Sequence, residues 1–392
     1  MKKLVAFILC MALVITCVAC FAACNPKDET PEGPKKVEMS GYNPETDGAM
    51  KVAMITDYGD ITDQSFNQTT YEACKAFSEA NSLAFKYFKP AGNSTEARVA
   101  SVEQAIQEGY NVVVMPGYAF GETVVEVADN NQDVTFVALD VSKSDLGADY
   151  VVPGNVATFV YREEISGFMA GYAAVKEGYK KLGFLGGIAV PAVIRFGYGF
   201  VQGANAAAVE MNIAKDVEVN YIYGGQFAGD AKITGVMDTW YGNGTEVVFA
   251  CGGGIYTSAC EAATKKGING KVIGVDSDQS YVINKNYGEG VCITSAMKGL
   301  APTVNTVLAA IKDGNWKNYY GTVSNMGMVS GTDASLNYVQ LPTATWSMTN
   351  FTKADYATLV GKIYNGTITI SSDTSAMPAT TIKVNETKTN IM

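Results

Sequence analysis

The chain contains no histidine among its 392 residues. Histidine is the commonest general base near neutral pH and the commonest zinc ligand in proteins. Its absence argues against most hydrolases and against a zinc site, although chemistry that uses only carboxylates or lysine stays compatible with the composition. The nucleotide-binding patterns GxxxxGK[ST] and GxGxxG are missing as well, because the glycine run 252–254 has neither spacing. We therefore expect no enzyme, no metal and no cofactor.

Basic residues are scarce relative to acidic ones. The chain has 29 Lys and Arg against 39 Asp and Glu, a net charge of −10. Without Lys2 and Lys3 of the leader described below, 27 basic residues face 39 acidic ones, and the net charge is −12. An acidic surface repels phosphate backbones and anionic lipid headgroups, so the sequence predicts no nucleic-acid partner.

Closely spaced cysteine pairs are also lacking outside the leader region. The eight cysteines divide into Cys10, Cys17, Cys20 and Cys24 near the start, and Cys74, Cys251, Cys260 and Cys292 in apolar surroundings, far apart or nine residues from each other. The later four read as small core residues. A disulfide framework is not expected, while a single bridge stays open.

The first 23 residues are typical of a lipoprotein signal peptide. Two lysines precede an almost wholly apolar run from Leu4 to Val18, and Ala22-Ala23 places small residues directly before Cys24. We expect cleavage before Cys24, lipidation of its thiol, and attachment to the extracytoplasmic face of the cell membrane. Cys20 is a weaker candidate, and an ordinary secretory signal is the alternative. Residues 24–48 are rich in Pro, Gly and charge, which is typical of a flexible tether.

After residue 50 the pattern alternates between short apolar runs and amphipathic stretches, which predicts parallel sheets buried on both faces. A first set has strands at 51–57, 83–88, 111–115 and 134–139, with helices at 64–81, 95–108 and 121–129. A helix at 161–176 opens a second set, with strands at 182–185, 217–222, 247–251 and 272–275 and helices at 190–211, 231–240 and 257–265. A strand at 291–296, a helix at 301–311 and a late helix near 353–363 follow.

Two successive sets of similar size predict an α/β protein of two lobes, each a doubly wound parallel sheet flanked by helices. We expect the first lobe to comprise 49–157 and about 284–330, and the second 158–283 and about 331–392. Ligands of open α/β sheets bind beyond the carboxyl ends of the strands. Those ends carry carboxylates, aromatic side chains and glycines, which suit a neutral, hydroxyl-rich ligand with a flat ring.

Three segments are distinctive. The first is DYGDITDQSFNQ at 57–68; the second is GVDSDQS at 274–280 followed by TSAMK at 294–298; the third is GGIAVP at 186–191 leading to Arg195-Phe196 and GFVQG at 199–203. In this order, behind a lipoprotein leader, they resemble the basic membrane protein family of solute-binding lipoproteins, exemplified by purine nucleoside receptors of ABC transporters. The resemblance runs from about Lys51 to Ala309. It implies the two-lobed type I periplasmic-binding-protein fold, with a ligand cleft between lobes that close by a hinge.

The resemblance also implies which residues contact the base of a nucleoside. Phe66 and Phe227 would sandwich it, Asn67 would pair with its edge, and Asp140 would accept from a ring N–H. Either aromatic could instead be a core residue, with Tyr223 as the substitute for Phe227.

The remaining implied contacts concern the sugar. Asp276 and Lys298 would bind the ribose hydroxyls, and Gly253 would let the backbone approach the sugar closely. Tyr118 and Asp57 would be secondary contacts. The alternatives are helix caps for the aspartates (57, 140 and 276, the last in competition with 278) and a solvated surface position for Lys298.

Other charged residues have structural interpretations. Arg195 lies within a predicted helix without basic neighbours, which favours a structural ion pair over anion capture. Glu163, Glu164 and Asp313 fall on helices expected to be exposed, where they could belong to a permease-docking surface.

The sequence and the resemblance thus predict a binding protein that captures a nucleoside, in the narrower expectation a purine nucleoside, and delivers it to the permease of an ABC importer. The same fold could bind riboflavin or another ring bearing hydroxyls, or could present its ligand to a membrane sensor. A nucleoside hydrolase that uses Asp57, Asp60 and Asp63 is the enzymatic alternative, and the lack of histidine argues against it.

Overall fold

The computed structural model describes residues 37–392. The predicted signal peptide 1–23, Cys24 and residues 25–36 of the predicted tether lie outside the described residues. Within the described part, no helix is both long enough and apolar enough to cross a membrane. Cys74, Cys251, Cys260 and Cys292 are all buried free thiols, which confirms their prediction as core residues.

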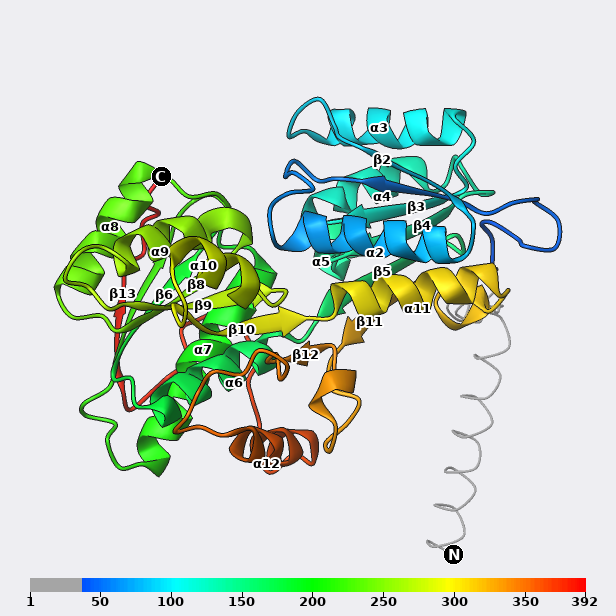
Figure 1. Ribbon diagram of the computed structural model, residues 1–392. Coiled ribbons are helices and arrows are strands. Elements are labelled where there is room, and N and C mark those ends of the chain that lie inside the picture. Colours follow the sequence, from blue (N-terminus) through cyan, green and yellow to red (C-terminus); the bar gives the residue numbers. More distant parts are fainter. Residues whose placement is uncertain (1–36) are drawn as a thin grey trace, which may run out of the picture. The chain divides into compact units, whose positions relative to one another are not determined.

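The first lobe is built on a six-stranded, all-parallel sheet with the spatial order β11-β5-β4-β3-β1-β2 (Figure 1). Its strands are β1 (Lys51–Ile55), β2 (Ala84–Phe88), β3 (Val112–Pro116), β4 (Thr135–Leu139), β5 (Val156–Tyr161) and β11 (Thr322–Met326). Its helices are α2 (Phe66–Ala80), α3 (Thr95–Gln107), α4 (Gly121–Val127), α5 (Lys143–Leu146) and α11 (Leu300–Lys312), with the 3-10 turn η1 (Tyr118–Phe120).

The second lobe is built on a seven-stranded sheet with the order β12-β10-β9-β8-β6-β7-β13, in which only the short β12 is antiparallel to its neighbour. Its strands are β6 (Lys181–Gly186), β7 (Glu218–Tyr223), β8 (Val247–Cys251), β9 (Lys271–Asp276), β10 (Cys292–Lys298), β12 (Val339–Gln340) and β13 (Lys383–Glu386). Its helices are α6 (Glu163–Glu177), α7 (Pro191–Glu210), α8 (Ala231–Gly242), α9 (Tyr256–Ala263), α10 (Ser280–Tyr287) and α12 (Lys353–Tyr364). Two further 3-10 turns are η2 (Gly253–Ile255) and η4 (Ala334–Leu336), while η3 (Trp316–Asn318) follows α11 and contacts the first lobe.

Both faces of each sheet are covered, as the continuous apolar strands predict. Along β1, Val52 and Met54 point to the core shared with α2 and α11, whereas Ala53 and Ile55 point to the core under α3 and α4. The second sheet packs against α6 and α7 on one face and α8, α9 and α10 on the other. These arrangements confirm the predicted fold of two doubly wound α/β lobes.

The chain crosses between the sheets three times, after β5, β10 and β11, so neither lobe is a continuous segment. The crossing points differ from those expected. Strand β5 lies wholly in the first sheet although the expected boundary fell at residue 157, and β10 pairs with β9 in the second sheet although 284–330 was expected in the first lobe. A strand that follows its neighbour through a single short helix usually pairs beside it, and α10 is such a helix. The chain therefore leaves the second sheet only after Lys298.

The described end of the predicted tether is not free. Tyr42 is 6% exposed, its backbone N–H donates to Thr135 Oγ1 (2.9 Å), and the N–H of Ser40 donates to the carbonyl of Gly154 (3.1 Å). The segment around Tyr42 thus packs on the first lobe at the start of the interior strand β4, because an aromatic residue within a polar segment can bury its ring.

Helices α6 and α7 cross at very short range. A Cβ atom added to Gly171 would lie 2.0 Å from the carbonyl oxygen of Phe200 and 3.0 Å from the amide nitrogen of Ala204. Backbone atoms cannot move aside as the end of a flexible side chain can. The crossing therefore depends on the missing side chain.

We predict that Gly171→Ala lowers the free energy of unfolding by about 1–3 kcal/mol, the usual cost of overpacking a core. Gly235→Ala is the matched control, since Gly235 lies in α8 with nothing within 4 Å of its added Cβ. That control is expected to stabilise the protein by about 0.5–1 kcal/mol through helix propensity alone. Urea unfolding measures both, and equal effects of the two variants would contradict the close crossing.

Candidate functional site

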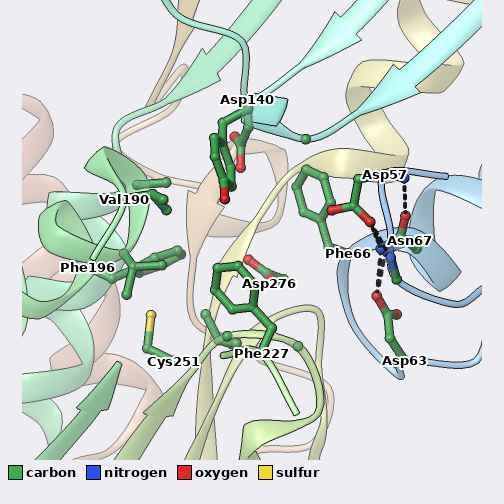
Figure 2. A pocket seen from close by; sticks show the side chains of 18 of the residues that line it. Asp57, Asp63, Phe66, Asn67, Asp140, Val190, Phe196, Phe227, Cys251 and Asp276 are labelled. Atoms are coloured by element: carbon green, nitrogen blue, oxygen red, sulfur yellow. Dashed lines mark hydrogen bonds between the residues drawn. The ribbon is translucent and has the colours of Figure 1, made fainter. Parts of the chain in front are cut away.

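A cavity of about 460 Å³ lies where the carboxyl ends of strands from both sheets meet. All nine residues that the sequence predicts as ligand contacts line it: Asp57, Phe66, Asn67, Tyr118, Asp140, Phe227, Gly253, Asp276 and Lys298. Figure 2 shows the cavity from close by, with Asp57, Phe66 and Asn67 on one side and Phe196 and Val190 on the other. The structure brings the nine residues together, and their contacts with a ligand stay a prediction.

Lys298 is the electrostatic centre of the cavity wall. It is the last residue of β10, and its side chain is only 4% exposed. Its ammonium forms an ion pair with Asp140 and lies 3.5 Å from Asp276 Oδ1 and 3.8 Å from Glu163 Oε1. Burial alone would lower the pKa of Lys298, but the three carboxylates together raise it above its ordinary range. The lysine is therefore held as a buried cation.

Three aromatic rings surround the same ammonium. Its nitrogen lies 4.7 Å from the ring centre of Phe66, 5.7 Å from that of Phe196 and 5.8 Å from that of Tyr161. The negative faces of aromatic rings attract cations at such distances. These rings exclude water from Lys298 while they add to its stabilisation.

The two carboxylates closest to Lys298 have the same backbone conformation in the two lobes. Asp140 directly follows β4 with φ +59°, and Asp276 ends β9 with φ +65°. Left-handed φ values are uncommon for residues other than glycine, and such strained positions cluster at functional sites. Asp140 Oδ1 is buried without a protein partner among the described residues, which leaves an acceptor free at the cavity.

Asp276 is also tied to the opposite lobe. The hydroxyl of Ser65 donates to Asp276 Oδ2 at 2.6 Å, and the carbonyl of Gln64 accepts from Ser277 Oγ (3.3 Å) and Gln279 Nε2 (3.1 Å). Burial raises the pKa of the Asp276 carboxyl, whereas Lys298 and the bond from Ser65 oppose that shift. The segment before α2 therefore contacts the end of β9 directly across the cleft.

Asp63 makes the Ser65 hydroxyl available for this contact. Ser65 precedes α2 but does not cap it through its side chain. The carboxylate of Asp63 does so instead, since it accepts from the backbone N–H groups of Ser65 (2.9 Å), Asn67 (2.9 Å) and Gln68 (3.1 Å). A capping carboxylate satisfies N–H groups that the first helical turn leaves without partners.

The side chains of Asn67 and Asp57 are both used within their own loop. Asn67 Nδ2 donates to Asp57 Oδ1 and Asp63 Oδ2, at 3.1 Å each, as the dashed lines of Figure 2 show. Asp57 Oδ1 also accepts from the N–H groups of Tyr58 and Gly59 at 2.6 Å. Burial raises the pKa of Asp57 despite these bonds. Asp57 therefore does not cap α2, the alternative given for it above, because its carboxylate bonds to the two residues that follow it and Asp63 caps the helix.

The third acid of the hydrolase alternative, Asp60, also lines the cavity but is paired with a lysine. It pairs with Lys89 at 2.7 Å on an exposed surface, while Asp57 and Asp63 bind backbone N–H groups. Across residues 37–392, no three potential metal ligands gather into a binding group.

The ring of Phe227 packs directly against the backbone of two glycines. A Cβ atom added to Gly187 would lie 2.3 Å from the ring of Phe227, and one added to Gly252 would lie 2.6 Å from it. Both glycines directly follow strands, β6 and β8, so the flat ring rests against the strand ends. The adjacent backbone is fixed too, because the N–H of Gly254 donates to the carbonyl of Phe227 at 2.8 Å.

Three charged residues have positions or roles that the sequence analysis did not predict. Glu163 and Glu164, expected on an exposed helix, are 0% and 1% exposed, so that expectation is wrong. Arg195 forms the predicted ion pair, through Nε to Glu163 Oε2 at 2.6 Å, but it also lines the cavity. Its position in the third distinctive segment, beside Phe196, was the available signal. For Glu163 no local signal exists, because a glutamate at a helix start is usually solvated.

Comparison with known proteins places these observations in a family. The family model described as "ABC transporter substrate-binding protein PnrA-like" matches residues 50–372, well over half of the chain. The "ABC transporter nucleoside-binding protein BmpA" of Lactococcus lactis subsp. cremoris is 28% identical over 348 residues, which is 84% of this chain and 90% of that protein. "Basic membrane protein A1" of Borrelia garinii subsp. bavariensis is 30% identical over 65% of this chain and 70% of its own length.

Solved structures share the fold. A solute-binding protein of an ABC transporter system from Conexibacter woesei superposes with a TM-score of 0.62 at 21% identity, covering 83% of this chain and 99% of that chain. One from Aeropyrum pernix gives a TM-score of 0.63 at 20% identity over 75% and 76%.

We predict a pH-dependent effect of Glu163→Gln. Burial raises the pKa of Glu163 to about 6, above its ordinary value of 4.5, although Arg195 and Lys298 oppose the shift. Between these values the folded state binds more protons than the unfolded state, so Glu163 lowers the free energy of unfolding as the pH rises. At 1.36 kcal/mol per pH unit, this loss reaches about 2 kcal/mol and is complete above pH 6.

Urea unfolding at intervals from pH 4 to 8 measures the effect. The stability of Glu163→Gln relative to the unmodified protein is expected to rise by about 2 kcal/mol between pH 4.5 and 6 and to stay level above that. Glu289→Gln, at an exposed position, serves as the control. A stability difference that is the same at every pH would contradict the burial of an ionising Glu163.

Proposed function

This chain belongs to the PnrA-like family of ABC transporter substrate-binding proteins, and we propose that it captures a nucleoside, most specifically a purine nucleoside, for import. Solute binding follows from the family. One observation supports the choice of a nucleoside: two aromatic rings from opposite lobes line the same cavity as a lysine that is paired with carboxylates.

The aromatic rings suit a planar base. Phe66 starts α2 in the first lobe, and Phe227 follows β7 in the second, so a flat ring between them would contact both lobes. Stacking of a base on an aromatic side chain contributes roughly 1–3 kcal/mol. The cavity volume of about 460 Å³ lies within the usual range of small-molecule sites, about 300–1,000 Å³.

The polar groups suit a ribose. Vicinal hydroxyls can donate to the carboxylate of Asp276 and accept from the ammonium of Lys298. Asp140 Oδ1 offers a further acceptor without a protein partner among the described residues. A site with buried groups of this kind discriminates strongly against ligands that leave them unpaired.

Charge favours a nucleoside over a nucleotide. Six aspartates line the cavity, at positions 57, 60, 63, 140, 145 and 276, against two cations, Lys298 and Arg195. A phosphate group would face this excess of negative charge. The neutral nucleoside carries the same base and sugar without that cost.

Capture would proceed by closure of the two lobes. The contacts of Ser65 with Asp276, and of Gln64 with Ser277 and Gln279, join the lobes across the cleft and would form as it closes. The three crossing segments after β5, β10 and β11 would supply the hinge. Closure excludes water and so strengthens every polar contact inside.

The protein would deliver its ligand to the permease of the transporter rather than transform it. A relative named as a nucleoside-binding protein of an ABC transporter supports this role. Riboflavin, another ring with hydroxyls, and presentation of the ligand to a membrane sensor are the alternatives to be tested. The lack of histidine supports a binding protein over a hydrolase.

The ligand is tested by calorimetric titration of the chain from Val37 onward, after unfolding and refolding to remove ligand retained from expression. Inosine, guanosine, adenosine, uridine, ribose and riboflavin form the panel. We expect selective binding of purine nucleosides. Phe227→Ala should weaken it about 5- to 150-fold, the equivalent of one lost stacking contact.

Controls separate the outcomes. Asp276→Asn should weaken nucleoside binding as well, whereas Tyr281→Ala removes an aromatic residue that is 73% exposed outside the cavity and should change nothing. Binding of riboflavin or ribose alone would keep the family and reject the nucleoside. Release of free base from inosine would reject the binding-only role.

We further propose that Cys24 carries the lipid that holds the protein at the extracytoplasmic face of the membrane. In a bacterial host, Cys24→Ala should abolish incorporation of labelled fatty acid and release the protein from the membrane fraction. Cys20→Ala is the matched control and should leave both unchanged. Loss of label in Cys20→Ala instead would assign the lipid to that position.

A further inference from the structure

The final ten residues of the sequence lie along the outer edge of the second sheet, beyond the range 50–372 that the family model matches. Strand β13 pairs in parallel with β7, with Lys383 opposite Glu218 and Glu386 opposite Tyr221. Figure 1 shows this strand in red at the sheet edge, with the chain end near α8.

The chain continues past β13 onto the loop that follows β7. The N–H of Thr387 donates to the carbonyl of Tyr221 (2.8 Å), that of Ile391 to Tyr223 (3.1 Å), and that of Met392 to Gly224 (3.1 Å). The side chain of Ile391 is partly buried against the core under α8 and α9. Residues 387–392 therefore extend the sheet edge along the loop 224–228.

The same loop leads to Phe227, and its other side is bound to β6. The N–H groups of Gly224 and Gly225 donate to the carbonyls of Gly186 (2.7 Å) and Gly187 (2.9 Å). Gly225 has φ +88°, and a Cβ atom there would lie 3.1 Å from the carbonyl oxygen of Met392. The loop is thus enclosed between the end of β6 and residues 390–392.

We propose that residues 387–392 are a positioning element of the ligand site, which holds the loop 224–228 so that the ring of Phe227 is presented to the cavity. Two adjacent glycines make this loop flexible by itself, and ordering it on binding would cost affinity. A segment that orders the loop beforehand removes that cost. This inference rests on the proposed function in so far as Phe227 contacts the ligand.

The test compares the full chain with a variant that lacks residues 390–392. The deletion removes the donors to Tyr223 and Gly224 but keeps β13 and the bond from Thr387. Hydrogen exchange is followed at the amides of Gly224, Gly225 and Gly254, and the affinity for the nucleoside that the full chain binds is measured in parallel. Lys388→Ala, at an exposed residue of the same segment, is the control.

We expect exchange in the loop to become at least about tenfold faster, with β6 and β8 unchanged, and the affinity to fall about tenfold through faster dissociation. Ile391→Ala keeps the amide donors and should show the same changes at smaller size, which guards against a general loss of stability in the deletion. Unchanged loop exchange, or faster exchange with unchanged affinity, would overturn the proposal. If the full chain binds no nucleoside, the proposed function fails, while loop exchange still decides whether this segment holds the loop.

Discussion

A buried lysine between carboxylates of both lobes is the interaction on which the rest of the site depends. Lys298 ends a strand of the second sheet, yet its ion pair with Asp140 lies in the first lobe. A charge with 4% exposure must be paired, since removal of one partner of a buried pair costs about 3–5 kcal/mol. The lysine therefore joins the two lobes and also supplies the buried positive charge of the cavity. Glu163 of α6 and Arg195 of α7 continue this series of ion pairs.

The two lobes share the same sequence of local structures around this lysine. In each, the third strand from the start of the lobe (β3 or β8) is followed by a glycine with positive φ, Gly117 or Gly252, then by a 3-10 turn and a helix. In each, the next strand leads to an aspartate in the left-handed region, Asp140 or Asp276. The repeat brings equivalent carboxylates of the two lobes to Lys298. The departure from symmetry lies in the aromatic residues, because Phe66 starts a helix whereas Phe227 lies in a loop that glycines and residues 390–392 enclose.

Much of this was predictable from the sequence, because strand ends can be read from apolar runs and ligand-facing residues follow strand ends. That reasoning, with the family resemblance, predicted nine of the residues that line the cavity and most helices and strands up to α11. It missed β5 and the two short helices α5 and α10. It failed where pairing depends on contacts remote in sequence. The pairing of β11 with β5, the burial of Tyr42 on the first lobe and the ion pair of Glu163 with Lys298 all depend on segments more than 90 residues apart. Residues after 314 gave weak local patterns, and they supply strands to both sheets.

The interleaved path of the chain has a consequence for its synthesis. The face of the first sheet that carries Val52 and Met54 is covered by α11, which lies some 250 residues later, and the edge beside β5 is closed by β11 later still. The second sheet receives β12 and β13 last of all. Neither lobe can complete its core while the ribosome is still adding these segments. The nascent chain consequently exposes apolar surface of the first sheet until residues 300–326 have been synthesised, and exposed surface of this kind is prone to aggregation.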